Sequence, residues 1–169
     1  MASRHTTHER SERPGRGGRL LARLPTLAFR AGLAPALGKR LLLLHHTGRA
    51  SGLTWHTVLE VVAYDPENCS WTVASGFGPD ADWYRNLRRN PKTVLQFGNR
   101  HHAVTAHFLT SDEGASVMAR YARRYPRTAR RRCAVIGHPV DGSEAEYREV
   151  GRSIPFVRLD TSQGAQADY

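Results

Sequence analysis

The sequence LLLLHHTGRASG, at residues 41–52, decides the fold. An apolar run, Leu41–Leu44, leads into the loop Thr47–Gly52, and an alternating β-branched run follows from Thr54 to Tyr64. This order predicts a strand, a tight loop and a second strand. Glycine tolerates positive φ, so the loop can turn several backbone N–H groups toward one point, and Arg49 adds a charged fork suited to phosphate or carboxylate. The loop is therefore a candidate anion site, although a plain hairpin connection with its arginine in solvent has the same pattern.

Short antiparallel turns connect the strands that follow. Residues 65–68, Asp-Pro-Glu-Asn, predict a hairpin between the strand ending at Tyr64 and a partner at 70–75. Gly98-Asn99 joins strands at 93–97 and 100–109, and residues 154–159 form a final strand. We expect an α+β fold, a mainly antiparallel β-barrel with packed helices, rather than a parallel nucleotide-binding sheet.

Helical periodicity appears in the connections between strands and after the fifth strand. Four helices are expected, over residues 80–90, 110–125, 126–137 and 143–152. Asp80 or Asp82 is expected to cap the first of them. Thr110 and Glu113 have the spacing of a capping box, and Ser143 begins a second segment with that spacing.

Charge and composition limit the class of partner. The chain has 169 residues and a formal net charge of +10, which favours nucleic acid, an anionic membrane surface or a small ligand with several negative groups. Cys69 and Cys133 lack paired spacing, and adjacent histidines on a strand point to opposite faces, so we predict no metal site. The arginines between 120 and 132 suit phosphate, but no groove-reading motif accompanies them, and nucleic acid is not favoured.

Four segments are expected along the chain. They are a disordered basic arm at 1–18, an amphipathic segment at 19–38, a main domain at 39–160 and a tail at 161–169. The amphipathic segment has three interpretations: it lies on a membrane surface, covers a cofactor, or packs its leucines against the main domain. No apolar run approaches the length of a membrane span, so we expect a cytoplasmic protein, with peripheral membrane contact through the N-terminal segment as an alternative.

Three blocks resemble the deazaflavin-dependent nitroreductase family. They are LLLLHHTGRASG at 41–52, VASGFG at 73–78 and DWYRNLRRNP at 82–91, and SIPFVRL at 153–159 is similar to the family's C-terminal strand. Members have a split β-barrel fold and use the 5-deazaflavin coenzyme F420. The resemblance covers roughly residues 39–160 and implies a split-barrel deazaflavin-binding domain.

The resemblance also implies a set of site residues. The cofactor-binding residues would be Thr47, Gly48, Arg49, Ser51, Gly52, His56, Val58, Ala74, Ser75, Gly76, Trp83 and Asn86. Ser75 would form a hydrogen bond near the ring, and Tyr121, Tyr125 or His56 would supply a proton. Ala50 and Trp55 stand where the family usually has a lysine and an arginine.

The function implied is an F420-dependent oxidoreductase that transfers a hydride between reduced deazaflavin and a small organic acceptor. The alternative is a non-catalytic split-barrel protein that binds F420, FMN or another anionic ligand. Nitroreduction is not assigned, because an arginine-rich stretch follows Tyr125 where characterised relatives carry tyrosines. Relatives include monomers and dimers, so the chain is expected to be either a monomer or a homodimer.

Overall fold

Six antiparallel strands close into a barrel in the computed structural model, which describes residues 40–161. The strands are β1 (Leu41–Thr47), β2 (Thr54–Asp65), β3 (Ser70–Ala74), β4 (Lys92–Phe97), β5 (Arg100–Phe108) and β6 (Phe156–Thr161). Their order around the barrel is β1-β2-β3-β6-β5-β4. The predicted fold class, an antiparallel barrel with packed helices, is confirmed.

Alternation along the strands fills the barrel with apolar side chains. On β1, Leu42 and Leu44 point inward and are fully buried, and on β2 Val61 does the same. The remaining inward side chains include Trp71, Val73, Leu95, Val104, Val157 and Leu159. This core fixes the register of β1 against β2, in which Thr47 is opposite Thr54, and so places the loop between them at one end of the barrel.

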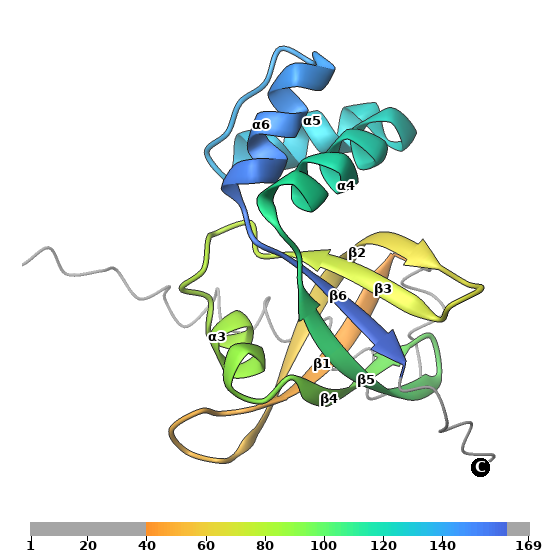
Figure 1. Cartoon of the computed structure of the whole chain (residues 1–169), viewed down its shortest axis with the longest axis vertical. Helices are drawn as coiled ribbons and strands as arrows, with labels where there is room; N and C mark the ends of the chain where they lie inside the picture. The colour runs from red at the N-terminus through yellow and green to blue at the C-terminus, as the bar shows by residue number, and fades with distance from the viewer. Residues whose placement is uncertain (1–39, 162–169) are drawn as a thin grey trace, which may run out of the picture.

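Four helices accompany the barrel within the described residues: α3 (Asp82–Arg89), α4 (Ser111–Arg124), α5 (Pro126–Val135) and α6 (Glu144–Ser153). Figure 1 shows α4, α5 and α6 gathered at one end of the barrel, while α3 lies beside the barrel in the connection between β3 and β4. None of these helices has both the length and the apolar character needed to span a bilayer.

Some of the helix and strand ends predicted from the sequence are confirmed, and others are wrong. The capping box of α4 is present, with Thr110 Oγ1 accepting from Glu113 N and the Glu113 carboxylate accepting from Thr110 N. The expected cap of α3 is wrong: Ala81 is the N-cap and makes no side-chain cap bond, and Asp82 is the first helical residue. There its charge still favours the helix N-terminus. The last strand begins at Phe156 rather than 154, because Ile154 caps the C-terminus of α6.

The helical layer is held by an unusually close contact between α4 and α6. A Cβ added to Gly151 would lie 2.5 Å from the carbonyl oxygen of Gly114, and a Cβ on Gly114 would lie 2.5 Å from the carbonyl oxygen of Gly151. The two backbones therefore meet where neither residue has a side chain. Around this contact, Tyr121, Cys133 and Phe156 belong to a second buried apolar cluster.

The predicted arm at 1–18, the amphipathic segment at 19–38 and all but the first residue of the tail lie outside the described residues. The division of the chain into these segments stays a prediction.

Candidate functional site

A cavity of about 410 Å³ lies between the β1–β2 hairpin and α3. Its lining comes from the end of β1, the loop, the start of β2 and one face of α3. The lining residues are His46, Gly48, Arg49, Ala50, Ser51, Trp55, His56, Thr57, Asp82 and Asn86.

The loop is closed by its own backbone. Gly48 N donates to Leu53 O and Gly52 N donates to Gly48 O, both at 2.8 Å, and Gly52 has a φ of +69°. A Cβ on Gly48 would lie 2.5 Å from Ser51 Oγ and 3.0 Å from Trp55 Nε1. Glycine is therefore favoured at Gly52 by a left-handed backbone and at Gly48 by the close approach of two side chains.

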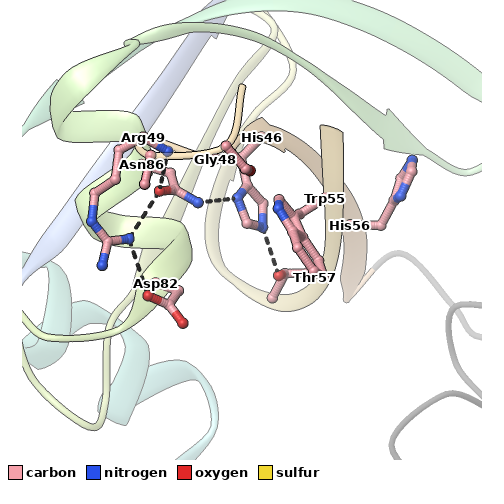
Figure 2. Close-up of a pocket in the computed structure, with 10 residues that line it drawn as sticks. His46, Gly48, Arg49, Trp55, His56, Thr57, Asp82 and Asn86 are labelled. Atoms are coloured by element: carbon pink, nitrogen blue, oxygen red, sulfur yellow. Dashed lines mark hydrogen bonds and ion pairs between the residues drawn. The ribbon is translucent and has the colours of Figure 1, made fainter. Parts of the chain in front are cut away.

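Asn86 connects the loop to the barrel (Figure 2). Its Oδ1 accepts from Arg49 N at 3.1 Å and from Arg49 Nη1 at 3.0 Å, while its Nδ2 lies 2.9 Å from His46 Nδ1. Because Arg49 donates twice to the amide oxygen, the amide nitrogen must face His46 and donate to it. Asn86 is 3% exposed, so its amide is shielded from bulk water.

His46 is consequently a neutral imidazole with a defined tautomer. Its Nδ1 accepts from Asn86, so the ring proton is on Nε2, which donates to Thr57 Oγ1 at 2.9 Å. Burial lowers the pKa of His46 below the ordinary 6.5, the neighbouring His56 lowers it further, and Asp82 partly offsets both. His46 therefore holds no charge in the cavity at neutral pH.

Arg49 supplies the positive charge of this cavity. Its side chain is one third exposed and its Nη1 forms an ion pair with Asp82 Oδ1 at 3.0 Å. Asp82 is largely exposed, so the ion pair is screened by solvent and an incoming anion can compete for the guanidinium.

A second cavity of about 180 Å³ lies between β2, the end of β3 and the helical layer. Its lining residues are Glu60, Val62, Ala74, Gly76, Met118, Tyr121, Arg132, Cys133, Ile136, Ile154 and Phe156. Its walls are mainly apolar, and its charged groups are Glu60 and Arg132.

Glu60 is the centre of a polar cluster in the second cavity. Tyr121 Oη donates to Glu60 Oε1 at 3.0 Å, Arg40 Nη2 lies 3.2 Å from the same oxygen, and Arg132 Nε lies 2.9 Å from Oε2. Burial and then the charge of Glu60 raise the pKa of Tyr121 to about 12. Tyr121 therefore keeps its proton and gives its hydrogen bond to a carboxylate.

The structure divides the predicted site residues between the two cavities. The first cavity holds Gly48, Arg49, Ser51, His56 and Asn86. The second holds Ala74, Gly76 and Tyr121. The predicted residues that line neither cavity are Thr47, Gly52, Val58, Ser75, Trp83 and Tyr125.

Several of these six residues have clear local partners. The Ser75 hydroxyl donates to Gly78 O at 2.5 Å, and Val58 packs against Leu43 on the outside of the barrel. The ring of Tyr125 lies under the Arg40 guanidinium, 4.6 Å from its centre, and beside Tyr121.

Trp83 does not form the expected aromatic wall. It is 8% exposed and belongs to the barrel core, in edge-on contact with Tyr84. Trp55 instead presents an indole that is 55% exposed in the first cavity. The indole that borders the cavity is thus at a position where the family resemblance led us to expect a basic residue.

Sequence reasoning missed His46, Thr57 and Asp82 in the first cavity and Glu60 with Arg132 in the second. Two signals could have found some of them. His46 continues the inward alternation of Leu42 and Leu44, which points it into the barrel end beside the loop. Glu60 is a carboxylate inside a β-branched run, and such a charge requires a partner when it is half-buried.

A protein-family model described as F420H(2)-dependent quinone reductase matches residues 29–137. The chain belongs to this family. As a member of the F420H(2)-dependent quinone reductase family it is an F420-dependent reductase, and its cofactor is coenzyme F420. The expected enzyme class and the expected cofactor, F420, are confirmed. FMN is no more than the alternative cofactor.

One relative and two solved structures are similar to this member of the family. Rv3178 of Mycobacterium tuberculosis, named as a candidate F420H(2)-dependent quinone reductase, is 36% identical over 86 residues, which are 50% of this chain and 71% of that protein. The crystal structure of Rv2991 from the same organism matches with a TM-score of 0.52 at 15% identity, covering 79% of this chain and 80% of that one. A structure described as a domain-swapped dimer has a TM-score of 0.50 at 20% identity and covers 85% of this chain and 98% of that one. At these identities the two structures show a shared fold.

The first cavity fits part of this family's coenzyme. F420 has a flat ring system and an acidic tail, and the cavity offers an exposed indole, a partly exposed guanidinium and a loop closed by its own backbone. Indoles suit flat heterocycles and guanidinium groups suit phosphate and carboxylate. Asp82 is the one carboxylate among the described residues that line this cavity, and its ion pair with Arg49 works against anion binding.

Proposed function

We propose that the chain catalyses the two-electron reduction of a quinone-type acceptor by reduced F420. The observation that carries the proposal is the first cavity, where Arg49, Trp55 and the loop closed at Gly48 and Gly52 meet. Bound F420 in its reduced form supplies a hydride, and a quinone that takes up this hydride and one proton becomes a hydroquinone. The quinone as acceptor comes from the family description and from the name of the mycobacterial relative.

In this proposal the residues of the chain bind, orient and exclude water. Arg49 and the loop hold the acidic part of the cofactor, and Trp55 covers a flat face. Ala74, Gly76 and Tyr121 line the mainly apolar second cavity, which β2 also borders through Glu60 and Val62, and receive the acceptor there. The other predicted site residues, apart from Trp83 in the barrel core, keep their assigned roles as proposals.

Arg49→Ala should weaken F420 binding by about tenfold or more, since one charge-assisted contact is worth about 1.5–3 kcal/mol. The dissociation constant is measured by titrating the protein with reduced and oxidised F420 while following tryptophan fluorescence, to which Trp55 contributes. Arg100→Ala, an exposed arginine in the β4–β5 hairpin, is the control and should bind as wild type does. An unchanged affinity for Arg49→Ala would remove the loop from the cofactor site.

Asp82→Asn should have the opposite effect and tighten F420 binding, because it frees Arg49 from its ion pair and removes a negative charge from the cavity. The same titration measures it. Weaker binding by Asp82→Asn would mean that Asp82 serves to orient Arg49 for the ligand.

Tyr121→Phe should lower kcat by less than about tenfold, because the hydroxyl already donates to Glu60 and a pKa of about 12 makes it a poor acid. The rate is measured with reduced F420 and saturating menadione across the pH range in which the protein is folded. The shape of the pH profile should also stay unchanged. A loss of about a hundredfold, the usual effect of removing a general acid, would instead make Tyr121 the proton donor.

One experiment separates catalysis from storage of the cofactor. Oxidation of reduced F420 that depends on both the protein and menadione supports the proposal. Tight F420 binding without oxidation by any quinone in a panel would support a carrier, and a preference for FMN over F420 would contradict the cofactor assignment.

A further inference from the structure

The two most exposed large apolar side chains in residues 40–161 are next to the second cavity. Phe77 is 82% exposed in the connection after β3, and Val135 is 65% exposed at the end of α5. Phe77 follows Gly76 and Val135 precedes Ile136, and both of these neighbours line the second cavity. A Cβ on Gly76 would lie 2.9 Å from Ile136 Cγ2, so the two segments touch there. The exposed apolar pair therefore flanks a point where a loop and a helix close over the cavity.

The helix that carries Val135 is strongly basic. The ten residues of α5 include four arginines and no aspartate or glutamate. Arg127, Arg131 and Val135 are four residues apart and share the outward face of α5. None of Arg127, Arg130 and Arg131 forms an ion pair with a residue in 40–161.

A groove between α4, α5 and the start of α6 gathers cations over an apolar floor. Arg123 of α4 and Arg127 and Arg130 of α5 line this cavity of about 380 Å³, beside the small or buried side chains of Ala122 and Tyr147. Glu144 also lines it and forms an ion pair with Arg148. Three cationic side chains above apolar residues suit a phosphate attached to an apolar molecule.

We propose that Phe77, Arg127, Arg131 and Val135 form a docking face for an anionic lipid bilayer. The apolar side chains of Phe77 and Val135 enter the interfacial region, and the arginines of α5 contact lipid phosphates, as on amphipathic helices that lie on membranes. A duplex nucleic acid would satisfy the arginines but not the exposed phenylalanine and valine. The combination of uncompensated cations and exposed apolar side chains on one face therefore favours lipid.

Docking through this face would place the second cavity at the membrane surface, where a lipophilic acceptor could reach it. This link to the acceptor rests on the proposed function, whereas the lipid contact rests on the docking face alone. It is also separate from the membrane contact predicted for residues 19–38, which lie outside the described residues.

The test is sedimentation of the full chain with vesicles of phosphatidylcholine alone or of phosphatidylcholine with phosphatidylglycerol. The wild type should bind the anionic vesicles and bind the neutral ones much more weakly. Arg127→Glu/Arg131→Glu should weaken binding to anionic vesicles by about tenfold or more, because each arginine near the surface contributes to the attraction. Phe77→Ser/Val135→Ser should weaken it by about fivefold or more through lost apolar burial.

The matched controls lie away from the docking face. Arg89→Glu/Arg100→Glu makes the same change in charge on α3 and the β4–β5 hairpin, and Val94→Ser removes an exposed apolar side chain from β4. Both should bind vesicles as the wild type does, and circular dichroism confirms that each variant is folded. Equal losses in the control and docking-face variants would overturn the proposal, as would wild-type binding by the docking-face variants or a preference for a DNA duplex over vesicles.

Because the vesicles contain neither F420 nor a quinone, this result is independent of catalysis. If the protein binds vesicles through the docking face and yet fails to oxidise reduced F420, that pair of results would reject the proposed function and support the docking face.

Discussion

Asn86→Leu should abolish F420 binding and lower the free energy of unfolding by about 2 kcal/mol or more, since each buried group left without its partner costs about 1–3 kcal/mol. The amide of Asn86 serves Arg49 N, Arg49 Nη1 and His46 Nδ1 at once. A leucine fills the same space and satisfies none of them. Urea unfolding measures the stability and the fluorescence titration measures the affinity, with Arg85→Leu, an exposed neighbour on α3, as control.

Asn86→Asp tests the same network without removing its shape. One carboxylate oxygen can still accept from Arg49, but the other would face the Nδ1 lone pair of His46, so the pair needs a protonated imidazole. The pKa of His46 should rise above 6.5 in this variant, whereas in the wild type burial keeps it below 6.5. A titration of the His46 ring protons by NMR measures both values, and equal values in the two proteins would contradict the assigned tautomer.

The two proteins should respond to pH in opposite directions. In the wild type the folded pKa is lowered, so the contribution of neutral His46 to stability is present above about pH 6.5 and is lost as the pH falls through the folded pKa. In Asn86→Asp the folded pKa is raised, so the contribution is present below about pH 6.5 and is lost as the pH rises through the raised folded pKa. The difference in stability between the two proteins should therefore shrink on acidification.

Gly151→Ala should destabilise the fold by about 3 kcal/mol, at the upper end of the usual cost of overpacking, and lower Tm by roughly 10 °C. The new Cβ would lie 2.5 Å from Gly114 O and 2.7 Å from Ala115 Cα. Both are backbone atoms, which cannot turn away as a side chain can, so α4 and α6 must separate. Calorimetry measures Tm, and Gly114→Ala should behave in the same way.

The sign of the change in Tm for Gly151→Ala tests how closely the backbones of α4 and α6 approach each other. An alanine at an open position inside a helix is worth up to about 1 kcal/mol more than glycine. If α4 and α6 had room between them, Gly151→Ala would raise Tm. Arg120→Ala, an exposed position on α4, is the control and should change the stability by no more than about 0.5 kcal/mol.

Local patterns were enough to predict the strands and the hairpins between neighbours in sequence. The run at 41–44, the loop at 47–52 and the turn at 65–68 each specify a pairing between adjacent segments, and the structure forms those pairs. The pairings that close the barrel, β1 with β4, β3 with β6 and β5 with β6, join residues far apart in sequence. No periodicity within any one strand encodes them, so they could not be read locally.

The sequence predicted site residues that belong to a short motif. It did not predict the contacts between residues of different motifs. Arg49 and Asn86 each stood out within their own block, and the structure brings them together across 37 positions. The further bond from Asn86 to His46 depends on the position of His46 at the end of β1. Trp83 belongs to a motif but was misplaced. An aromatic residue on a short amphipathic helix can line a ligand site or pack in a core, and Trp83 packs with Leu87 in the barrel core.

Among the elements within residues 40–161, strand β2 alone lines both cavities, and its twelve residues set the spacing between them. Thr57 borders the first cavity and Glu60 the second, and three residues of extended chain span roughly 10 Å. Removing one residue between them would shorten that interval by about 3.3 Å and would also turn every following side chain to the other side of the barrel wall. The distance between a ligand in the first cavity and a ligand in the second is therefore set by the number of β2 residues between the two cavities. The depth of either cavity matters less.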